Sequence, residues 1–203
     1  EPIAAAIGAG LPISEATGSM IVDIGGGTTE IAVMSLGGVV FSKSLRIAGD
    51  AMDGAIINYM RKKFNLLIGE STAEKIKKEI GTAIPTTNNI FLMKGRDIRT
   101  GTPKEISLTE EDACEALMPI LNQMLAAIKE ALESTPPELS ADLVDMGLVL
   151  TGGGAMLKNI DKLISKDTGL PVTIADNPLE CVAIGTGKAL ENEEIFSTMM
   201  SEY

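Results

Sequence analysis

The sequence contains no histidine and has far fewer basic than acidic residues. Its 17 lysines and arginines face 28 aspartates and glutamates, which gives a formal net charge of -11. Proteins that bind nucleic acid or anionic lipid present clustered basic side chains to the phosphates. Because no basic stripe is present, we expect no nucleic acid binding.

Cysteine is also scarce, and long apolar runs are missing. Cys114 and Cys181 lie far apart in helical patterns, and no cluster of cysteine and histidine indicates a metal site. No apolar run approaches the roughly 18 residues of a membrane-spanning helix, and the first residues lack the pattern of a secretion signal. We therefore expect a soluble protein of the reducing cytoplasm.

The amino-terminal part predicts a short helix followed by strands. Pro2 and a run of small residues favour a helix that ends near Gly10 and Pro12. Because the chain starts at what looks like the beginning of this helix, we expect it to be a fragment of a longer protein. Glycines then separate three β-rich runs, which predict an antiparallel meander over residues 19–24, 29–36 and 39–47.

The period of the apolar residues changes at Asp50. Helical spacing follows, and Ser71 with Glu74 predicts a capping box for a second helix. Two more strands are predicted at residues 88–98 and 104–108. The span from about 50 to 107 therefore predicts a small α+β subdomain inserted at the edge of the main sheet.

A long amphipathic helix is predicted next. Thr109 and Asp112 would cap it, it would run to about Ser134, and Pro119 would kink it. The pattern then predicts a strand, three glycines and a helix, followed by a strand at 171–175 and a last helix capped by Asn177. With its 203 residues, 45% of them hydrophobic, such a chain can build a sizeable α/β core.

Two triple-glycine turns each follow an apolar strand. In the first, Gly25, Gly26 and Gly27 can point backbone N–H groups into one concavity, a nest that binds phosphate oxygens. Thr28 and Thr29 would add hydroxyl donors. A turn of this kind can also serve only close packing. The occurrence of two favours phosphate binding.

The residues around the two turns extend this interpretation. Asp23 ends a buried strand, where a carboxylate is costly without a partner, and a hydrated Mg²⁺ bound to nucleotide phosphates would supply one. The second turn, Gly152, Gly153 and Gly154, opens a helix, whose N–H groups favour an anion or a closely held nucleoside.

Other glycine-rich nucleotide motifs fit the sequence poorly. A P-loop needs GxxxxGK[ST] leading into a helix, whereas the first turn leads back into a strand. "GTGKAL" near the end lacks the required spacing and the final serine or threonine. A dinucleotide-binding fingerprint needs GxGxxG with an acidic residue about 20 positions on, and neither turn supplies it.

Four motifs in this order resemble the actin, heat-shock chaperone and sugar-kinase superfamily, and within it the MreB family of bacterial actins. "VDIGGGTTEIAV" is similar to the second phosphate motif and "LVLTGGGAML" to the adenosine motif, while "EPIAAAIGAG" and "CVAIGTGKAL" are similar to the two connecting helices. The resemblance runs from Glu1 nearly to Glu191. It implies a ribonuclease H-like α/β domain of the actin type with an inserted α+β subdomain.

The resemblance also implies roles for individual residues. Asp23 would hold the water shell of Mg²⁺, the backbone at Gly25 to Thr28 would wrap the terminal phosphates of ATP, and Glu1 would orient the attacking water. Without the resemblance, Glu1 is simply a carboxylate at a helix start. The positions expected to contact or border the nucleoside are Glu74, Lys77, Lys78, Gly152, Gly153, Gly154, Ala155 and Met156. Glu74, Lys77 and Lys78 would otherwise be a solvated charged face, and Met156 a core residue.

The family pattern covers only the second of two domains, because the other phosphate loop, DxGT, has no counterpart here. The chain would hold half of a nucleotide cleft, and we expect little or no ATP hydrolysis from it alone. The complete protein would be a cytoplasmic ATPase that polymerises into filaments organising wall synthesis and rod shape. Expected partners are further copies, the missing first domain and wall-synthesis proteins, with membrane contact only through that domain. Alternatives are a chaperone ATPase, a small-molecule kinase and a division-associated relative.

Overall fold

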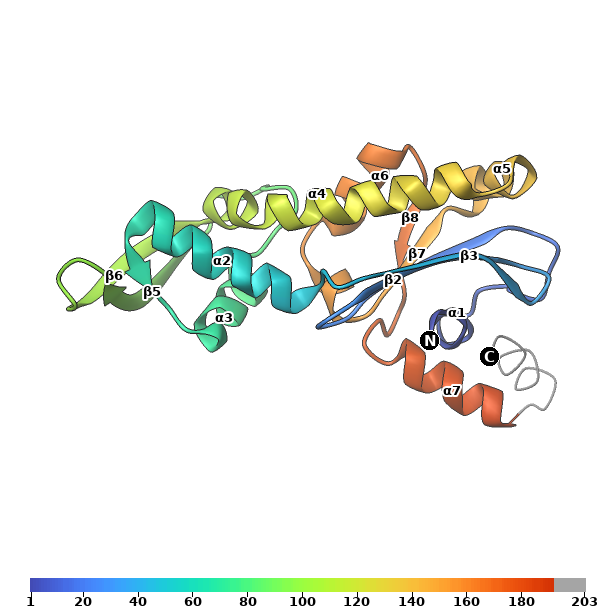
Figure 1. The fold of residues 1–203 in the computed structure, drawn as a ribbon, viewed down its shortest axis with the longest axis horizontal. Coiled ribbons are helices and arrows are strands. Elements are labelled where there is room, and N and C mark those ends of the chain that lie inside the picture. The colour runs from blue at the N-terminus through green and yellow to red at the C-terminus, as the bar shows by residue number, and fades with distance from the viewer. Residues whose placement is uncertain (192–203) are drawn as a thin grey trace.

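The computed structural model describes residues 1–191. Its main sheet has five strands in the order β3-β2-β1-β7-β8 (Figure 1). The first three form the predicted antiparallel meander, whereas β7 and β8 are parallel to β1. The strand bounds are β1 Ser19–Ile24, β2 Thr29–Ser35, β3 Gly38–Leu45, β7 Leu148–Thr151 and β8 Val172–Ile174.

Helices cover both faces of this sheet. Three helices lie on one face, α4 (Glu110–Ser134), α5 (Pro137–Met146) and α6 (Ile160–Thr168). Two lie on the other, α1 (Pro2–Gly8) and α7 (Cys181–Glu191) (Figure 1). A strand covered on both faces must be apolar on both. This explains why all six residues of β1 are buried, including Asp23.

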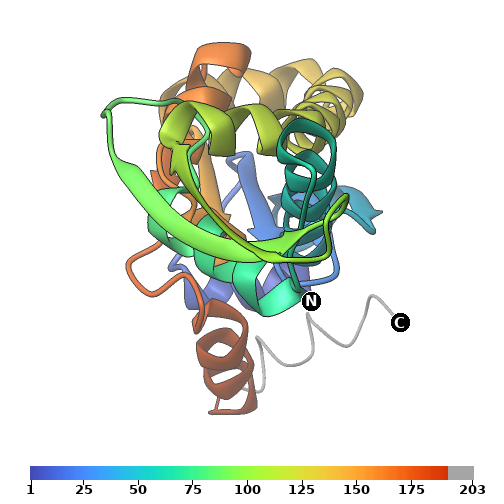
Figure 2. The ribbon, with the colours of Figure 1, turned by 90° about the vertical axis from the view of Figure 1, so that its left-hand side faces the viewer.

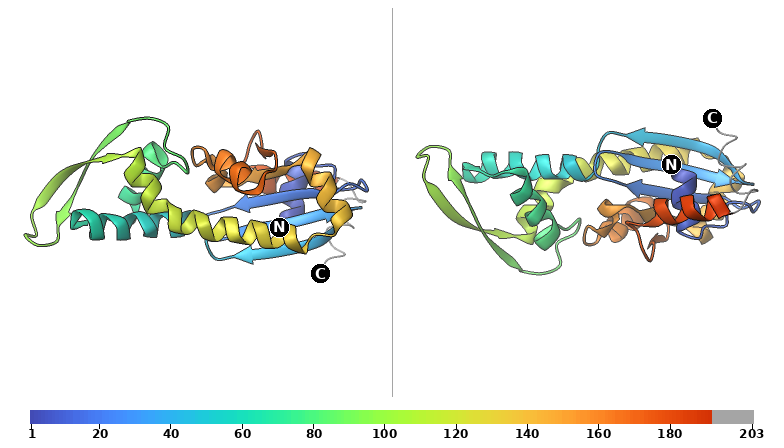
Figure 3. Two further views of the ribbon diagram at one scale, coloured as in Figure 1. Left: turned by 90° about the horizontal axis from the view of Figure 1, so that it is seen from above. Right: turned by 90° about the horizontal axis from the view of Figure 1, so that it is seen from below.

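The span after β3 forms a separate layer at one end of the molecule (Figures 2 and 3). It contains a second sheet, of order β4-β5-β6. Its elements are α2 Gly49–Phe64, β4 Leu66–Leu67, α3 Glu70–Ile80, β5 Ile90–Asp97 and β6 Pro103–Thr109. The architecture agrees with the predicted α/β fold carrying an inserted α+β subdomain.

Helix α4 joins this layer to the main sheet. Its predicted capping box is confirmed, because the Thr109 side chain accepts from the amide of Asp112 at 3.2 Å and the Asp112 side chain accepts from the amide of Thr109 at 3.0 Å. Pro119 lies within the continuous helix, which bends in its first half (Figure 3). Proline removes one helical hydrogen bond and so allows this bend. In the described part of the chain, no helix is long and apolar enough to cross a membrane.

The predicted caps of two other helices are wrong. Helix α3 begins at Glu70 with Gly69 as its N-cap, so Ser71 lies inside the first turn and makes no cap. Glu74 instead forms an ion pair with Lys78 at 2.6 Å. The last helix begins at Cys181 rather than after Asn177, because the carbonyl of Asn177 closes a turn by accepting from the amide of Glu180 at 3.0 Å.

Helix α5 was not predicted. It follows Pro136 and has Pro137 at its first position. A proline is well suited to the first turn of a helix, where its missing N–H would have had no partner.

Candidate functional site

The two glycine turns lie side by side at one edge of the main sheet. Strands β1 and β7 are parallel neighbours, and their register places Asp23 opposite Thr151. Each turn starts within two residues of these positions. Ligands of α/β proteins bind in the crevice beyond the carboxyl ends of such strands.

Asp23 is held in place at this edge by a residue that sequence reasoning missed. The hydroxyl of Thr151 donates to one oxygen of Asp23 at 2.7 Å, and Asp23 is only 7% exposed. Among the described residues, no lysine or arginine forms an ion pair with Asp23. A carboxylate in this situation suits a cation held beside it at this edge of the sheet. Thr151 directly precedes the second glycine turn, a position that could have signalled its role.

The first glycine turn is tight and open toward solvent. The amide of Gly25 donates to the carbonyl of Thr28 at 2.9 Å, which closes the turn. Gly26 and Gly27 are exposed, and a Cβ at Gly27 would meet no atom within 4 Å. The space beside Gly27 is therefore free for a ligand.

The amino end of α2 fixes the shape of this turn. The amides of Gly49 and Asp50 donate to the carbonyls of Gly25 and Gly26 at 3.1 and 2.8 Å. The carbonyls therefore turn toward α2.

The two threonines of the turn have different positions. Thr29 is fully buried, and its hydroxyl donates to the carbonyl of Ile47 at 2.7 Å. This hydroxyl is occupied within the fold and does not face the open turn. Thr28 is half-buried, so it is the better candidate for a hydroxyl donor.

The second glycine turn packs directly on the end of β1. Gly152 has a φ of +80°, and a Cβ there would lie 2.3 Å from the carbonyl oxygen of Ile24. A Cβ at Gly154 would lie 2.2 Å from the Ile24 side chain. These two glycines are needed for close packing, which is the structural alternative that the sequence left open.

The rest of this turn leaves other groups accessible. Residues Gly153–Met156 form one 3-10 turn, in which Ala155 is buried. Gly153 is exposed and Met156 is 61% exposed. Met156 is therefore not a core residue, and it remains available to contact a ligand.

The three charged residues predicted on α3 separate into two groups. Glu74 and Lys78 pair with each other on the surface. Lys77 instead reaches α2, donating to the carbonyl of Gly49 at 3.0 Å and to Asp53 at 2.9 Å. Only Lys77 is thereby linked to the first glycine turn.

The end of α3 is joined to the residues after the second turn. Lys158 donates to the carbonyl of Glu79 at 2.8 Å, and its own carbonyl accepts from the amide of Ala83 at 2.8 Å. The Asn159 side chain donates to the carbonyl of Ile84 at 2.9 Å. Helix α3 is thus tied to the surroundings of both glycine turns, a link between distant segments that the sequence did not reveal.

Glu1 lies exposed before α1, and its side chain makes no capping hydrogen bond. The structure therefore does not support a helix-capping role for this carboxylate. Its role in orienting water stays a prediction.

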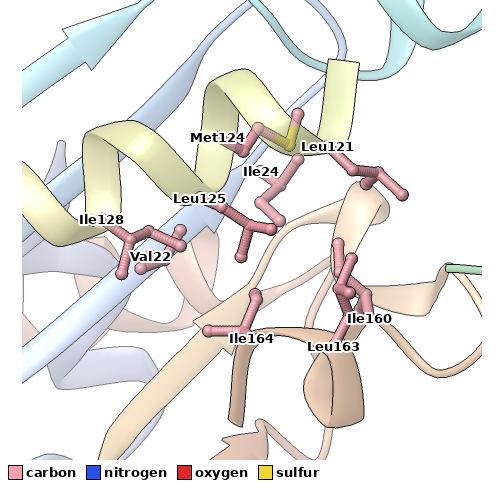
Figure 4. Close-up of a pocket in the computed structure, with 9 residues that line it drawn as sticks. All are labelled: Val22, Ile24, Leu121, Met124, Leu125, Ile128, Ile160, Leu163 and Ile164. Carbon is pink, nitrogen blue, oxygen red and sulfur yellow. The ribbon is translucent and has the colours of Figure 1, made fainter. Parts of the chain in front are cut away.

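A small void also lies near the site, but it belongs to the core. It has a volume of about 10 Å³ and is enclosed by α4, α6 and β1 (Figure 4). Its lining is entirely apolar, and such a cavity offers a water no polar partner. The residues around it are Val22, Ile24, Leu121, Met124, Leu125, Ile128, Ile160, Leu163 and Ile164.

Comparisons with known proteins agree with this geometry. The family model described as MreB/Mbl protein matches residues 1–198. The chain is 56% identical over 192 residues to the cell shape-determining protein MreB of Escherichia coli, a match that covers 94% of this chain and 55% of that protein. The chain thus spans little more than half the length of this relative.

Solved structures give the same result. The structure of MreB 5 of Spiroplasma citri bound to AMPPNP superposes with a TM-score of 0.91 at 37% identity, covering 100% of this chain and 60% of that one. A MamK double helical filament matches with a TM-score of 0.75 at 25% identity, covering 94% and 58%. These structures confirm the actin-like fold. The chain belongs to the MreB/Mbl family.

Proposed function

We propose that the chain is the second domain of an actin-like cytoskeletal ATPase that binds ATP with Mg²⁺ and assembles into filaments. The relatives support this proposal: the Escherichia coli protein is named cell shape-determining, and structures of the Spiroplasma protein are bound to AMPPNP and to ADP. The MamK structure is a double helical filament. The corresponding role here is to organise wall synthesis and rod shape.

The observation that carries the proposal is the placement of the two glycine turns. They leave neighbouring parallel strands at one edge, and the first turn has open space above Gly27. In this arrangement the backbone from Gly26 to Thr28 binds the terminal phosphates, since the amide of Gly25 already donates to the carbonyl of Thr28, and Gly153 and Met156 border the nucleoside. Lys77 approaches from α3.

Asp23 is the residue that would hold Mg²⁺, through water. Mg²⁺ usually keeps several waters and takes one or two carboxylates together with phosphate oxygens. In the described part of the chain, no group of three or more acidic or cysteine residues forms a metal cage. When bound, Mg²⁺ supplies positive charge that neutralises the phosphates.

Hydrolysis would need a water placed in line with the terminal phosphate, and Glu1 is the residue proposed to orient it. A first domain of the same protein would close the other side of the cleft. We assign three kinds of contact to the complete protein: filament contacts with further copies, contacts with wall-synthesis proteins, and contacts with the inner membrane face.

Gly27→Ala tests the nucleotide site. The added methyl group meets no protein atom within 4 Å, so folding should be preserved, but it would enter the space assigned to the phosphates. In the complete protein, ATP affinity measured by titration with Mg²⁺ should fall about tenfold or more, which corresponds to about 1.4 kcal/mol.

Gly54→Ala is the matched control, because a Cβ at Gly54 in α2 also meets nothing within 4 Å. It should leave ATP affinity unchanged. Equal affinity of the Gly27→Ala variant and the unsubstituted protein would show that the first turn does not hold phosphate.

A further inference from the structure

Lys77 is held from two directions. Its ammonium donates to the carbonyl of Gly49 at 3.0 Å and to Oδ2 of Asp53 at 2.9 Å. The Lys77 side chain is only 17% exposed and that of Asp53 only 14%. A long lysine side chain loses much conformational freedom when it is fixed in this way. The two hydrogen bonds therefore hold the Lys77 ammonium in one defined position.

The backbone at the start of α2, which Lys77 contacts, also forms hydrogen bonds with the first glycine turn. Gly49, whose carbonyl accepts from Lys77, donates its own amide to the carbonyl of Gly25 at 3.1 Å. The next amide, that of Asp50, donates to the carbonyl of Gly26 at 2.8 Å. An unbroken series of hydrogen bonds therefore runs from Asp53 through Lys77 and Gly49 to the turn.

The ion pair between Lys77 and Asp53 is a poor source of folding stability. Burial raises the pKa of Asp53, and the hydrogen bond and charge of Lys77 offset this only in part. The carboxylates of Glu74 and Asp50 raise that pKa further. The second oxygen of Asp53, Oδ1, is buried without a hydrogen-bond partner among the described residues. Partly buried ion pairs with such costs contribute little net stability.

We propose that Asp53 is the positioning residue of the nucleotide site, fixing Lys77 against Gly49 and thereby holding α3 in register with the first glycine turn. Asp53 acts through Lys77 and the backbone of α2. The nucleotide part of this assignment rests on the proposed function. The hydrogen-bond series itself does not depend on a bound nucleotide.

The test compares three variants of the complete protein. Asp53→Ala removes the contact with Lys77, and Asp53→Glu retains a carboxylate. Asp167→Ala is the matched control, because Asp167 also forms an ion pair, with Lys129 at 2.9 Å, between α6 and α4. Hydrogen exchange of the Gly49 and Asp50 amides is measured without nucleotide, and the dissociation constant for ATP with Mg²⁺ is measured by titration.

We expect Asp53→Ala to speed exchange at both amides and to raise the ATP dissociation constant about tenfold, the scale of effect for a misplaced binding group. Turnover at saturating ATP should change much less, since binding rather than the chemical step is affected. Asp53→Glu should restore part of the affinity, and Asp167→Ala should change neither measurement.

Two results would overturn the assignment. One is amide exchange in Asp53→Ala that matches Asp167→Ala. The other is faster exchange with unchanged ATP affinity. Failure of the unsubstituted protein to bind ATP would instead refute the proposed function. The exchange measurement is made without nucleotide, so it tests the role of Asp53 in the turn independently of that failure.

Discussion

At the scale of single residues, the site depends on polar groups buried at the ends of strands. Asp23 follows three apolar residues of β1 and is accommodated because Thr151 of the neighbouring strand donates to it. The buried hydroxyl of Thr29 also has a partner, since it donates to the carbonyl of Ile47. The sequence identified Asp23 as a buried carboxylate, but its partner is 128 residues away. No local pattern can identify such a pair, because it is set by strand register.

Replacement of Thr151 tests this pair. Thr151→Val keeps the shape of the side chain but removes the donor, which leaves a buried carboxylate oxygen without its hydrogen bond. The free energy of unfolding should fall by about 1–3 kcal/mol, as expected for a lost partner of a buried polar group. Urea denaturation provides the measurement.

Thr151→Ser is the control, because it retains the hydroxyl and loses only a methyl group. It should be the more stable of the two variants at neutral pH. Equal stability of the serine and valine variants would contradict a stabilising role for the hydrogen bond to Asp23.

At the scale of elements, α4 shows how local sequence signals and tertiary contacts combine. Its capping box was visible in the sequence at Thr109 and Asp112. The structure adds that the other oxygen of Asp112 accepts from Lys63 at 2.9 Å and from Tyr59 at 3.0 Å, both on α2. One carboxylate therefore caps α4 and also joins it to α2.

These contacts predict a pH dependence. Burial raises the pKa of Asp112, but hydrogen bonds from Lys63 and Thr109 outweigh it and hold this pKa below its ordinary value. The fold favours the charged form, so its stabilising contribution is present above the unfolded value of about 4 and is lost as pH falls through the folded pKa.

Asp112→Asn should therefore reduce the loss of stability below about pH 4, while lowering stability at neutral pH. Thermal unfolding at a series of pH values measures both effects. Parallel pH profiles for the Asp112→Asn and unsubstituted proteins would contradict this role of Asp112.

At the scale of the whole molecule, the main sheet and the inserted layer of α2, α3 and the second sheet meet near the glycine turns. The five-stranded sheet supplies both turns, and the inserted layer contributes α2 and α3 beside them. Helix α3 is linked to the first turn through the bond of Lys77 to Gly49, and to the residues after the second turn through Lys158. Nucleotide binding at this edge would therefore be sensitive to how the inserted layer sits on the sheet.

The proposed second-domain role predicts a difference between the chain and the complete protein. Alone, these 203 residues supply one side of the cleft, so they should bind ATP with Mg²⁺ weakly. The complete protein should bind it tightly. Isothermal titration of both is the measurement. Micromolar or tighter affinity for the chain alone, about -8 kcal/mol, would contradict the prediction.

The sequence by itself determined the class of fold and the location of the two turns, because apolar periodicity and glycine placement are local properties of the chain. The meander, the long capped helix and the glycine turns all follow from neighbouring residues. Local reading failed for two helices: Ser71 resembled a cap but lies inside α3, and α5, which begins at Pro137, was not predicted. Only the tertiary structure decided which residues meet. It paired Asp23 with Thr151 and buried the Thr29 hydroxyl. It also gave the adjacent Lys77 and Lys78 different partners, Asp53 on α2 and Glu74 on the surface of α3. The physical reason is that strand register and helix packing bring together groups that are distant in sequence.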